Sequence, residues 1–187
     1  MEAEDLIKNL RYSDYKKNHE KIKTAWEFAK HAHKGQFRGS GESYFTHPIS
    51  VAQILANLNL DLNTIVTGLL HDVVEDCGIT VTKISSIFGN EVALLVDGVT
   101  KLSKLELQSD RSKQAENFRK LFLATSNDIR VLLVKLADRT HNMRTIGGIN
   151  NIEKRQRIAQ ETLEIFAPLS ERVGLIGLKN EMEDLAF

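Results

Sequence analysis

The sequence predicts an all-α protein built from several helices. Apolar residues recur at three- and four-residue spacing along most of the 187 residues, a pattern typical of amphipathic helices. Only two prolines interrupt these patterns, and no segment keeps the two-residue alternation of a half-buried strand. With 42% hydrophobic residues the chain can bury a sizeable core, so its length favours one compact domain with a short helical appendage.

The expected helices follow from the apolar runs and from the residues that cap them. Asp61, Thr80, Asn90 and Asp128 each precede a run of helix formers, which is the usual position of an N-cap. The glycine-rich segment 35–44 is the longest break in the helical pattern. We therefore predict helices over residues 14–34, 47–59, 61–75, 80–88, 90–105, 110–126, 128–145, 151–168 and 175–186.

Composition and charge exclude several classes of protein. Lys plus Arg equals Asp plus Glu at 25 each, so no overall charge favours nucleic acid or an anionic membrane as partner. The single cysteine, Cys77, excludes an internal disulfide framework and a cysteine-based zinc cluster, and fits a reducing cytoplasm. The N-terminus is acidic where a signal peptide is basic, and no apolar stretch is long enough to span a bilayer. We expect a soluble cytoplasmic protein; its oligomeric state stays open.

The most informative feature is the doublet His71-Asp72, which lies inside the apolar run 65–74 and is followed at once by Glu75 and Asp76. Carboxylates near a core need a cation. An imidazole and a carboxylate at consecutive helical positions lie about 100° apart and can face one metal ion. An isolated His-Asp pair would more often be a core histidine beside a helix-end acid. The number of acids here favours a metal site.

His47 and Asp138 complete the predicted ligand set. His47 lies in the first turn of its helix, where Pro48 fixes the backbone. Asp138 follows the very apolar stretch 131–137, and a buried aspartate without a partner would be costly. Two histidines and two carboxylates suit one divalent ion such as manganese, iron or zinc, and the hard oxygens favour Mn²⁺. The predicted metal ligands are His47, His71, Asp72 and Asp138.

Glu75 and Asp76 are the predicted catalytic pair. Each follows a predicted ligand by four residues, which in one continuous helix places the pair one turn further along the same faces. A carboxylate there can accept a proton from an attacking water or return one to a leaving group. The alternative is a solvated helix end. Two acids at a helix C-terminus oppose the helix dipole, which favours the functional interpretation.

A second group of residues is suited to a nucleotide. The segment 35–44 is either a plain connector or a ligand cradle, and its Arg38 and Tyr44 favour the cradle. Asn142 and Thr145 follow Asp138 as a polar stripe that could hydrogen-bond a ribose or a base. Three further histidines fit structural roles better than ligation: His31, His33 and His141.

The assembled motifs resemble those of the HD phosphohydrolase superfamily and, more closely, the hydrolase domain of the RelA/SpoT alarmone enzymes. Five segments match in order and with family spacing, and the resemblance covers nearly the whole chain. They are Gly35–Pro48, Leu70–Asp76, Val99–Leu102, Asn117–Lys120 and Lys135–Thr145. The resemblance implies a multi-helix HD-domain bundle.

The resemblance also implies an activity, the Mn²⁺-dependent removal of the 3′-diphosphate from guanosine tetraphosphate or pentaphosphate. By position, the four predicted ligands hold the ion, and Glu75 and Asp76 orient or deprotonate the attacking water. Arg38 would pack on the guanine. The other implied substrate contacts are Ser40, Tyr44, Asn142 and Thr145.

The chain departs from the family pattern at Gly39, where the family often has a basic residue, and at Ser43, where it often has proline. One phosphate or base contact is therefore expected to be missing. Two alternatives stay open: an HD phosphohydrolase for another nucleotide, and a non-catalytic module that binds the alarmone.

The end of the chain resembles the helical bridge that leads to a synthetase domain in the long members of the family. We therefore divide the chain into a metal-dependent hydrolase domain, residues 1–165, and a helical extension, residues 166–187. A hydrolase-only protein and a fragment of a bifunctional enzyme are both compatible with this division.

Overall fold

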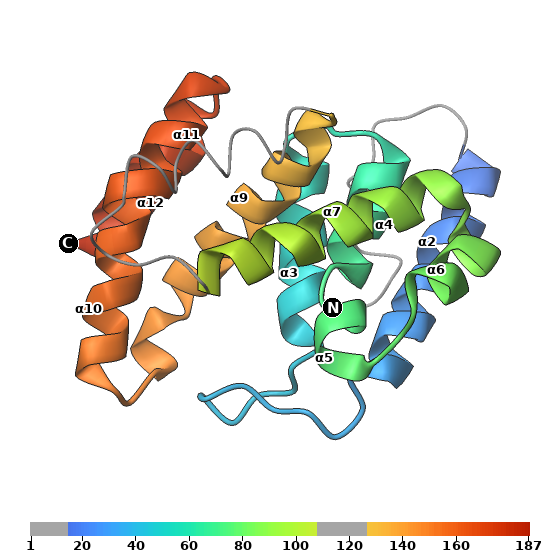
Figure 1. The fold of residues 1–187 in the computed structure, drawn as a ribbon, viewed down its shortest axis with the longest axis horizontal. Coiled ribbons are helices and arrows are strands. Elements are labelled where there is room, and N and C mark those ends of the chain that lie inside the picture. The colour runs from blue at the N-terminus through green and yellow to red at the C-terminus, as the bar shows by residue number, and fades with distance from the viewer. Residues whose placement is uncertain (1–14, 108–126) are drawn as a thin grey trace.

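The computed structural model of the protein describes residues 15–107 and 127–187. These residues form a helical bundle, as predicted, and one isolated antiparallel bridge joins Phe37 to Ser43 in the loop after the first described helix (Figure 1). The predicted helix 110–126 lies outside the described residues. The elements are α2 (Tyr15–Ala32), α3 (Thr46–Asn57), α4 (Leu62–Leu70), α5 (Val73–Cys77), α6 (Val81–Phe88), α7 (Asn90–Leu107), α9 (Ile129–Arg144), η2 (Ile146–Gly148), α10 (Ile152–Glu161), η3 (Thr162–Phe166), α11 (Ala167–Arg172) and α12 (Ile176–Ala186).

Three of the predicted N-caps do cap helices. The side chains of Asp61, Thr80 and Asp128 accept hydrogen bonds from backbone N–H groups in the first turns of α4, α6 and α9. Asn90 is the first residue of α7. These bonds satisfy N–H groups that have no partner inside their own helix, so the caps fix where each helix begins.

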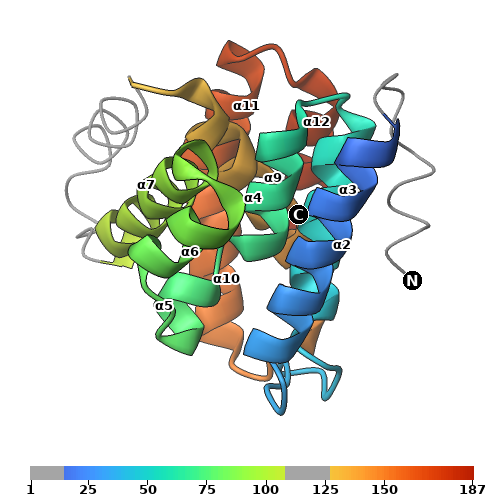
Figure 2. The same cartoon turned by 90° about the vertical axis from the view of Figure 1, so that its right-hand side faces the viewer.

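The centre of the bundle is α4, which packs against α2, α3, α7 and α9. Figure 2 shows α4 between α7 on one side and α2 and α3 on the other. Its residues from Thr64 to Leu70 are all buried, as the apolar run there predicts. The C-terminal end of this helix is therefore held rigidly, deep in the bundle.

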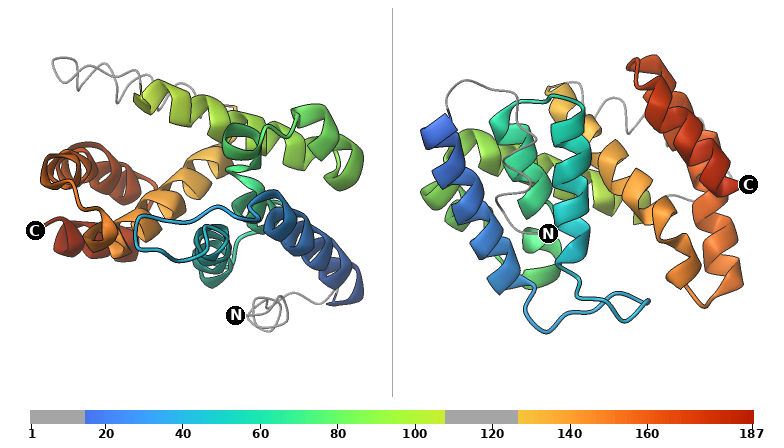
Figure 3. Two further views of the ribbon diagram at one scale, coloured as in Figure 1. Left: turned by 90° about the horizontal axis from the view of Figure 1, so that it is seen from below. Right: turned by 180° about the vertical axis from the view of Figure 1, so that it is seen from behind.

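The second organising helix is α9, which packs against α3, α4 and α7 and also against α12. Figure 3 shows it connecting the main bundle to the C-terminal helices. There the guanidinium of Arg139 lies 4.1 Å from the ring centroid of Phe166, and its Nη2 lies 3.4 Å from Glu161 Oε2. The π-helix η3 crosses residue 165, and the proposed division of the chain there remains a prediction.

The prediction of one helix over 61–75 is wrong, because α4 ends at Leu70 and α5 begins at Val73. His71 and Asp72 form the turn between them. The imidazole Nδ1 of His71 lies 2.8 Å from the carbonyl oxygen of Gly68, the acceptor that the Asp72 N–H would use in an uninterrupted helix. A side chain of the doublet thus takes part in breaking the helix that carries it.

The prediction of one helix over 151–168 is also corrected. The helical path continues past Pro168 to Arg172, with the π-helix η3 between α10 and α11. Pro168 lies in the first turn of α11, where its missing N–H is tolerated. The wider turns of the preceding π-helix give the proline ring room, so the proline does not end the helix.

Candidate metal centre and active site

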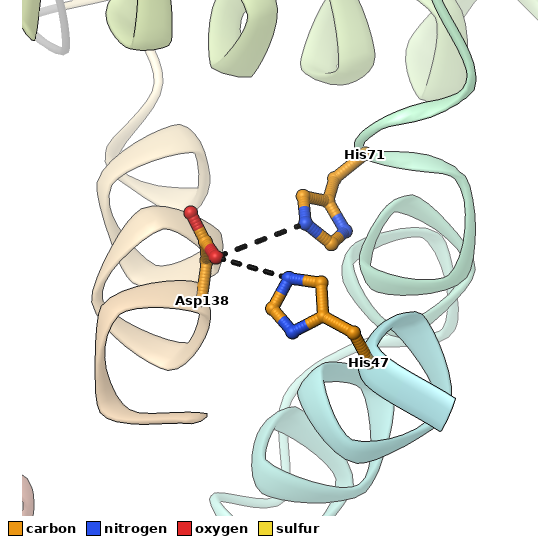
Figure 4. A group of neighbouring side chains, drawn as sticks. All are labelled: His47, His71 and Asp138. Atoms are coloured by element: carbon orange, nitrogen blue, oxygen red, sulfur yellow. Dashed lines mark ion pairs between the residues drawn. The ribbon is translucent and has the colours of Figure 1, made fainter. Parts of the chain in front are cut away.

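Side chains from three helical segments meet at one point near the middle of the bundle. His47 from α3, His71 from the end of α4 and Asp138 from α9 each offer one ligand atom, and these atoms lie within 4.8 Å of one another. Asp138 Oδ1 is 3.1 Å from His47 Nε2 and 4.0 Å from His71 Nε2 (Figure 4). All three residues are buried, so the polar centre is enclosed by the core.

Asp72 supplies a second carboxylate to the same point. Its Oδ2 lies 2.9 Å from His71 Nε2 and 3.6 Å from His47 Nε2. The hydroxyl of Tyr44 donates to that oxygen at 2.8 Å, and burial followed by the charge of Asp72 raises the pKa of Tyr44, which keeps it a donor. The structure therefore brings together all four side chains that the sequence pattern predicts as ligands.

The donor set fits a divalent cation. His71 Nε2 is buried and makes no hydrogen bond of acceptable geometry, although Asp72 Oδ2 lies close to it. The proton of a neutral His71 belongs on Nδ1, which faces the Gly68 carbonyl, so Nε2 presents its lone pair to the centre. A histidine held in this way by a carbonyl is typical of metal sites.

His47 is oriented by a neighbour that the sequence interpretation set aside as structural. The Nδ1 atoms of His47 and His141 lie 2.7 Å apart, so one ring donates to the other. Burial, then the positive charges of His47, Arg38 and Arg144, lowers the pKa of His141 to about 3. A neutral His141 accepts the proton of His47 Nδ1, which leaves His47 Nε2 as a ligand atom. The signal in the sequence is spacing, since His141 follows Asp138 by three residues.

The charges of the centre are strongly coupled. Burial opposes ionisation of Asp72, but His71 outweighs it and lowers the pKa of Asp72 to about 2. Burial likewise opposes protonation of His71, but Asp72 raises the pKa of His71 to about 9. For Asp138, Lys135 and His47 outweigh burial and hold the pKa well below its usual range. A metal ion would therefore displace a proton from His71, and its affinity should fall as the pH falls.

Glu75 and Asp76 line the same cavity, which has a volume of about 250 Å³ and includes His47, Asp72 and Asp138 in its wall. Burial, then Asp76 and Asp72, raises the pKa of Glu75. Burial, then Asp72, raises the pKa of Asp76. Glu75 and Asp76 lie on the separate short helix α5, not on one helix continuous with the predicted ligands, but they line the same cavity as those ligands.

Four of the five predicted substrate contacts are also grouped. Arg38 Nη2 donates to Asn142 Oδ1 at 3.1 Å and to Thr145 Oγ1 at 2.9 Å. The guanidinium lies 5.9 Å from the ring centroid of Tyr44, and Asn142 Nδ2 donates to Asp138 Oδ1 at 2.7 Å. A continuous set of polar contacts thus leads from the loop before α3 to the candidate metal ligand on α9.

Ser40, the fifth predicted contact, lies at a different place. Its loop packs against the turn η2, where a Cβ added at Gly148 would lie 3.2 Å from Ser40 Cβ. A Cβ added at Gly39 would lie 3.0 Å from the carbonyl oxygen of Gly148. The loop therefore packs closely against the chain after α9. A side chain at position 39 would fit there only if the backbone shifted.

The sequence interpretation gave no place in the site to two residues of the cavity wall, Ser103 and Lys135. Lys135 Nζ donates to Asp138 Oδ2 at 2.9 Å and to Ser103 Oγ at 3.1 Å. A lysine inside the apolar stretch before Asp138 could have been noticed, since it precedes that acid by three residues on the same face. Nothing local marks Ser103, which reaches Lys135 only because α7 packs on α9.

His33 and Gln36 make contacts next to the predicted catalytic pair. His33 Nδ1 is 2.7 Å from Gln36 Oε1, and its ring centroid is 4.9 Å from that of Tyr44. Gln36 Nε2 donates to the backbone carbonyl of Asp76 at 3.2 Å. These contacts tie the loop before α3 to α5.

Fold and site together define an all-helical protein whose buried histidine–aspartate cluster is suited to a divalent metal. The chain belongs to the HD domain family, whose model matches residues 25–176. HD domains depend on a metal, and the cluster of His47, His71 and Asp138 could hold one.

Comparison with curated proteins confirms the resemblance to the RelA/SpoT enzymes. The chain is 52% identical over 168 residues, 90% of its length, to a guanosine-3′,5′-bis(diphosphate) 3′-pyrophosphohydrolase of Vibrio cholerae. It is 56% identical over 169 residues, 89% of its length, to a GTP pyrophosphokinase of Myxococcus xanthus. It is 51% identical over 184 residues, 98% of its length, to the bifunctional (p)ppGpp synthase/hydrolase SpoT of Escherichia coli. The chain covers only 24%, 22% and 24% of these relatives, so it spans about a quarter of their length.

A solved structure shares the fold. It is described as "A metazoan ortholog of SpoT hydrolyzes ppGpp and plays a role in starvation responses", and it superposes with a TM-score of 0.68 at 23% identity. The match covers 88% of this chain and 93% of that chain. Among the helices of residues 15–107 and 127–187, none is long and apolar enough to cross a membrane.

Proposed function

We propose that this protein is a guanosine-3′,5′-bis(diphosphate) 3′-pyrophosphohydrolase. It would remove the 3′-diphosphate of guanosine tetraphosphate or pentaphosphate and release GDP or GTP together with pyrophosphate. The observation that carries the proposal is the cavity in which His47, Asp72 and Asp138 lie beside Glu75 and Asp76. Relatives that are 51–52% identical over most of the chain bear this activity in their names.

The proposed resident ion is Mn²⁺, held by His47, His71, Asp72 and Asp138. Two imidazole nitrogens and carboxylate oxygens suit a borderline to hard first-row ion, and the candidate cluster contains no thiolate that would favour a softer one. When bound, such an ion supplies Lewis-acid stabilisation of a phosphoryl group and makes water more acidic.

The side chains of the protein transfer protons and bind the substrate. Water attacks the phosphorus bonded to the 3′-oxygen, that P–O bond breaks, and the 3′-oxygen leaves as the hydroxyl of GDP or GTP. Glu75 or Asp76 accepts the proton of the water and returns one to the leaving oxygen; raised pKa values suit them to both steps. Tyr44 holds Asp72 by its hydroxyl. Arg38, with Asn142 and Thr145, would receive the nucleoside, and Ser40 would contact it from the loop.

The other proposed properties follow from composition. The balanced charge gives no reason to expect nucleic acid or a membrane as partner, so the proposed partner is a small guanine nucleotide. The single cysteine, which forms no disulfide within the chain, supports a cytoplasmic location. The oligomeric state stays open.

The direct test is release of pyrophosphate from guanosine tetraphosphate by the purified protein with Mn²⁺. Replacing the proton-transfer groups in Glu75→Gln and Asp76→Asn should each lower kcat about 10²–10⁴-fold, the usual contribution of a general acid or base. Asp72→Ala should abolish turnover. Glu27→Gln, an exposed substitution on α2, is the matched control and should leave turnover unchanged.

The same assay separates the alternatives. Equal turnover of nucleotides that lack the 3′-diphosphate would replace the alarmone by another substrate. Tight binding of guanosine tetraphosphate without product after long incubation would indicate a non-catalytic binding module, which the missing side chain at Gly39 could produce. Full activity in Glu75→Gln would refute the role assigned to Glu75.

A further inference from the structure

Lys135 is an unexpected cation in a cavity of acids. Among the residues of 15–107 and 127–187, nine line the cavity; four of these are Asp or Glu, and Lys135 is the one Lys or Arg. Its side chain is only 8% exposed, although lysine rarely loses contact with water. Burying an ammonium group costs free energy unless carboxylates and hydrogen bonds compensate its charge.

The ammonium group holds the carboxylate oxygen that faces away from the histidines. Lys135 Nζ donates to Asp138 Oδ2 at 2.9 Å, whereas Asp138 Oδ1 lies 3.1 Å from His47 Nε2. The two oxygens of a carboxylate lie in one rigid plane. Fixing Oδ2 therefore fixes the direction of Oδ1, the proposed ligand atom. Asn142, one turn further along the same face of α9, donates to Oδ1 at 2.7 Å.

A second contact fixes the lysine itself. The flexible stem of lysine allows its ammonium group many positions, so a single ion pair orients a carboxylate weakly. Here Nζ also donates to Ser103 Oγ at 3.1 Å, across the packing of α7 on α9. The contact to another helix gives the ammonium group a position that does not depend on Asp138.

We propose that Lys135 is a positioning residue that, with Ser103, holds Asp138 so that Oδ1 faces the metal. The proposal deepens the proposed function and rests on its metal centre. The proposal predicts that removing this positive charge weakens metal binding, the opposite of what charge repulsion alone predicts. A positive charge near the ion repels it, so a lysine that only balanced the acids would weaken metal binding, and its removal would strengthen it. A lysine that orients a ligand strengthens metal binding, and its removal weakens it.

The test is titration of metal-free protein with Mn²⁺, read by the fraction of free Mn²⁺. Loss of a group that orients a metal ligand typically costs about 10–100-fold in affinity, so Lys135→Met should raise the Mn²⁺ dissociation constant by that factor. Ser103→Ala keeps the charge and the contact to Asp138, and should weaken binding less but in the same direction. Lys101→Met removes an exposed lysine of α7 that pairs with Asp97, and should change nothing.

Activity gives a second readout. If Lys135 acts through Asp138, excess Mn²⁺ should restore much of the turnover of Lys135→Met, and the KM for the nucleotide should stay near the wild-type value. A lysine that bound the substrate would instead raise that KM, and Mn²⁺ would not restore it.

Unchanged or tighter Mn²⁺ binding in Lys135→Met overturns the proposal, and so does a raised KM that excess Mn²⁺ leaves in place. If circular dichroism shows that Lys135→Met does not fold, Ser103→Ala decides in its place, and wild-type affinity in that variant overturns the proposal. Failure of the wild-type protein to bind Mn²⁺ would contradict the metal centre itself. The two failures are therefore distinguishable.

Discussion

At the scale of single residues, the positions of Glu75 and Asp76 lower the stability of the fold when their carboxyl groups are ionised. Their pKa values are raised by burial and by neighbouring acids, so the folded protein favours their protonated forms. The stability that such a group contributes is present below its unfolded-state pKa and is lost as pH rises through its folded-state pKa. Ionising these two carboxylates in the folded protein therefore costs folding stability, as expected of groups placed for chemistry.

The double variant Glu75→Gln, Asp76→Asn should therefore unfold at a higher urea concentration than the wild type at pH 7, with metal removed by a chelator. The difference should shrink as the pH falls to and below about 4, the unfolded-state pKa of these acids, because the wild-type side chains then become neutral in both the folded and the unfolded state. Urea unfolding at the two pH values measures it.

The exposed substitution Glu27→Gln serves as the control and should show no comparable rise at pH 7. A double variant that is equally or less stable than the wild type at pH 7 would contradict the electrostatic account.

Sequence patterns predicted the side chains that meet at the centre better than those that orient them. His47, His71, Asp72 and Asp138 stand out because polar groups in apolar runs need a reason, and the structure brings the four together. Their role as ligands stays a prediction. The orienting contacts of His141, Lys135 and Ser103 could not be read from a local pattern, because they depend on how α3, α7 and α9 pack.

At the scale of elements, the decisive feature is the close packing of α3 on α4, which sets the separation of His47 and His71. A Cβ added at Gly68 would lie 2.7 Å from Leu55 Cδ1 and 3.2 Å from Ala52 Cα. The leucine side chain could move, but the backbone of Ala52 could not move without shifting the helix. Only glycine allows the two helices to approach this closely.

Gly68→Ala should accordingly destabilise the protein by about 1–3 kcal/mol, the usual cost of overpacking a core. It should also weaken Mn²⁺ binding, since α3 carries His47 and the end of α4 carries His71. Urea unfolding and Mn²⁺ titration measure the two effects.

Gly177→Ala is the matched control. Gly177 lies in α12, and a Cβ there meets nothing within 4 Å. Its stability should stay equal or rise by up to about 1 kcal/mol, the intrinsic preference of a helix for alanine. If Gly68→Ala were as stable as the wild type, the close approach would not limit the packing of the two helices.

Element types were predictable, but the breaks between elements were less so. The apolar run 65–74 continues through His71 and Asp72 without any turn residue, and so it predicted one helix. The break depends on the contact between the His71 ring and the Gly68 carbonyl, which no periodicity reports. Conversely, the helix that was predicted to end at residue 168 continues past Pro168 to Arg172, after the π-helix η3.

At the scale of the whole molecule, the all-α prediction is confirmed because it rested on signals repeated along the entire chain. Three packings between helices, which the sequence alone did not predict, bring the candidate ligands together: α3 on α4, α3 on α9 and α4 on α9. The centre therefore exists only in the folded state, since its ligands come from segments far apart in the chain.

An ion that binds only the folded state must stabilise it. At a free Mn²⁺ concentration of 100 times the dissociation constant, the free energy of unfolding should rise by about 2.7 kcal/mol. For a chain of this size that corresponds to an increase in Tm of roughly 5–10 °C. Thermal unfolding with Mn²⁺ and with chelator measures the shift.

His47→Ala and His71→Ala should lose the shift, whereas His31→Gln, an exposed change on α2, should keep it. A shift that survives in both alanine variants would place the ion elsewhere.

The contact between Gly39 and the carbonyl of Gly148 has an evolutionary consequence. A lineage that gains a basic side chain at position 39 must also shift the backbone near position 148 by a few tenths of an ångström, because the added Cβ would lie 3.0 Å from that carbonyl oxygen. Positions 39 and 148 lie more than a hundred residues apart in the sequence. Substitutions at the two positions should nevertheless have occurred together during the divergence of this family.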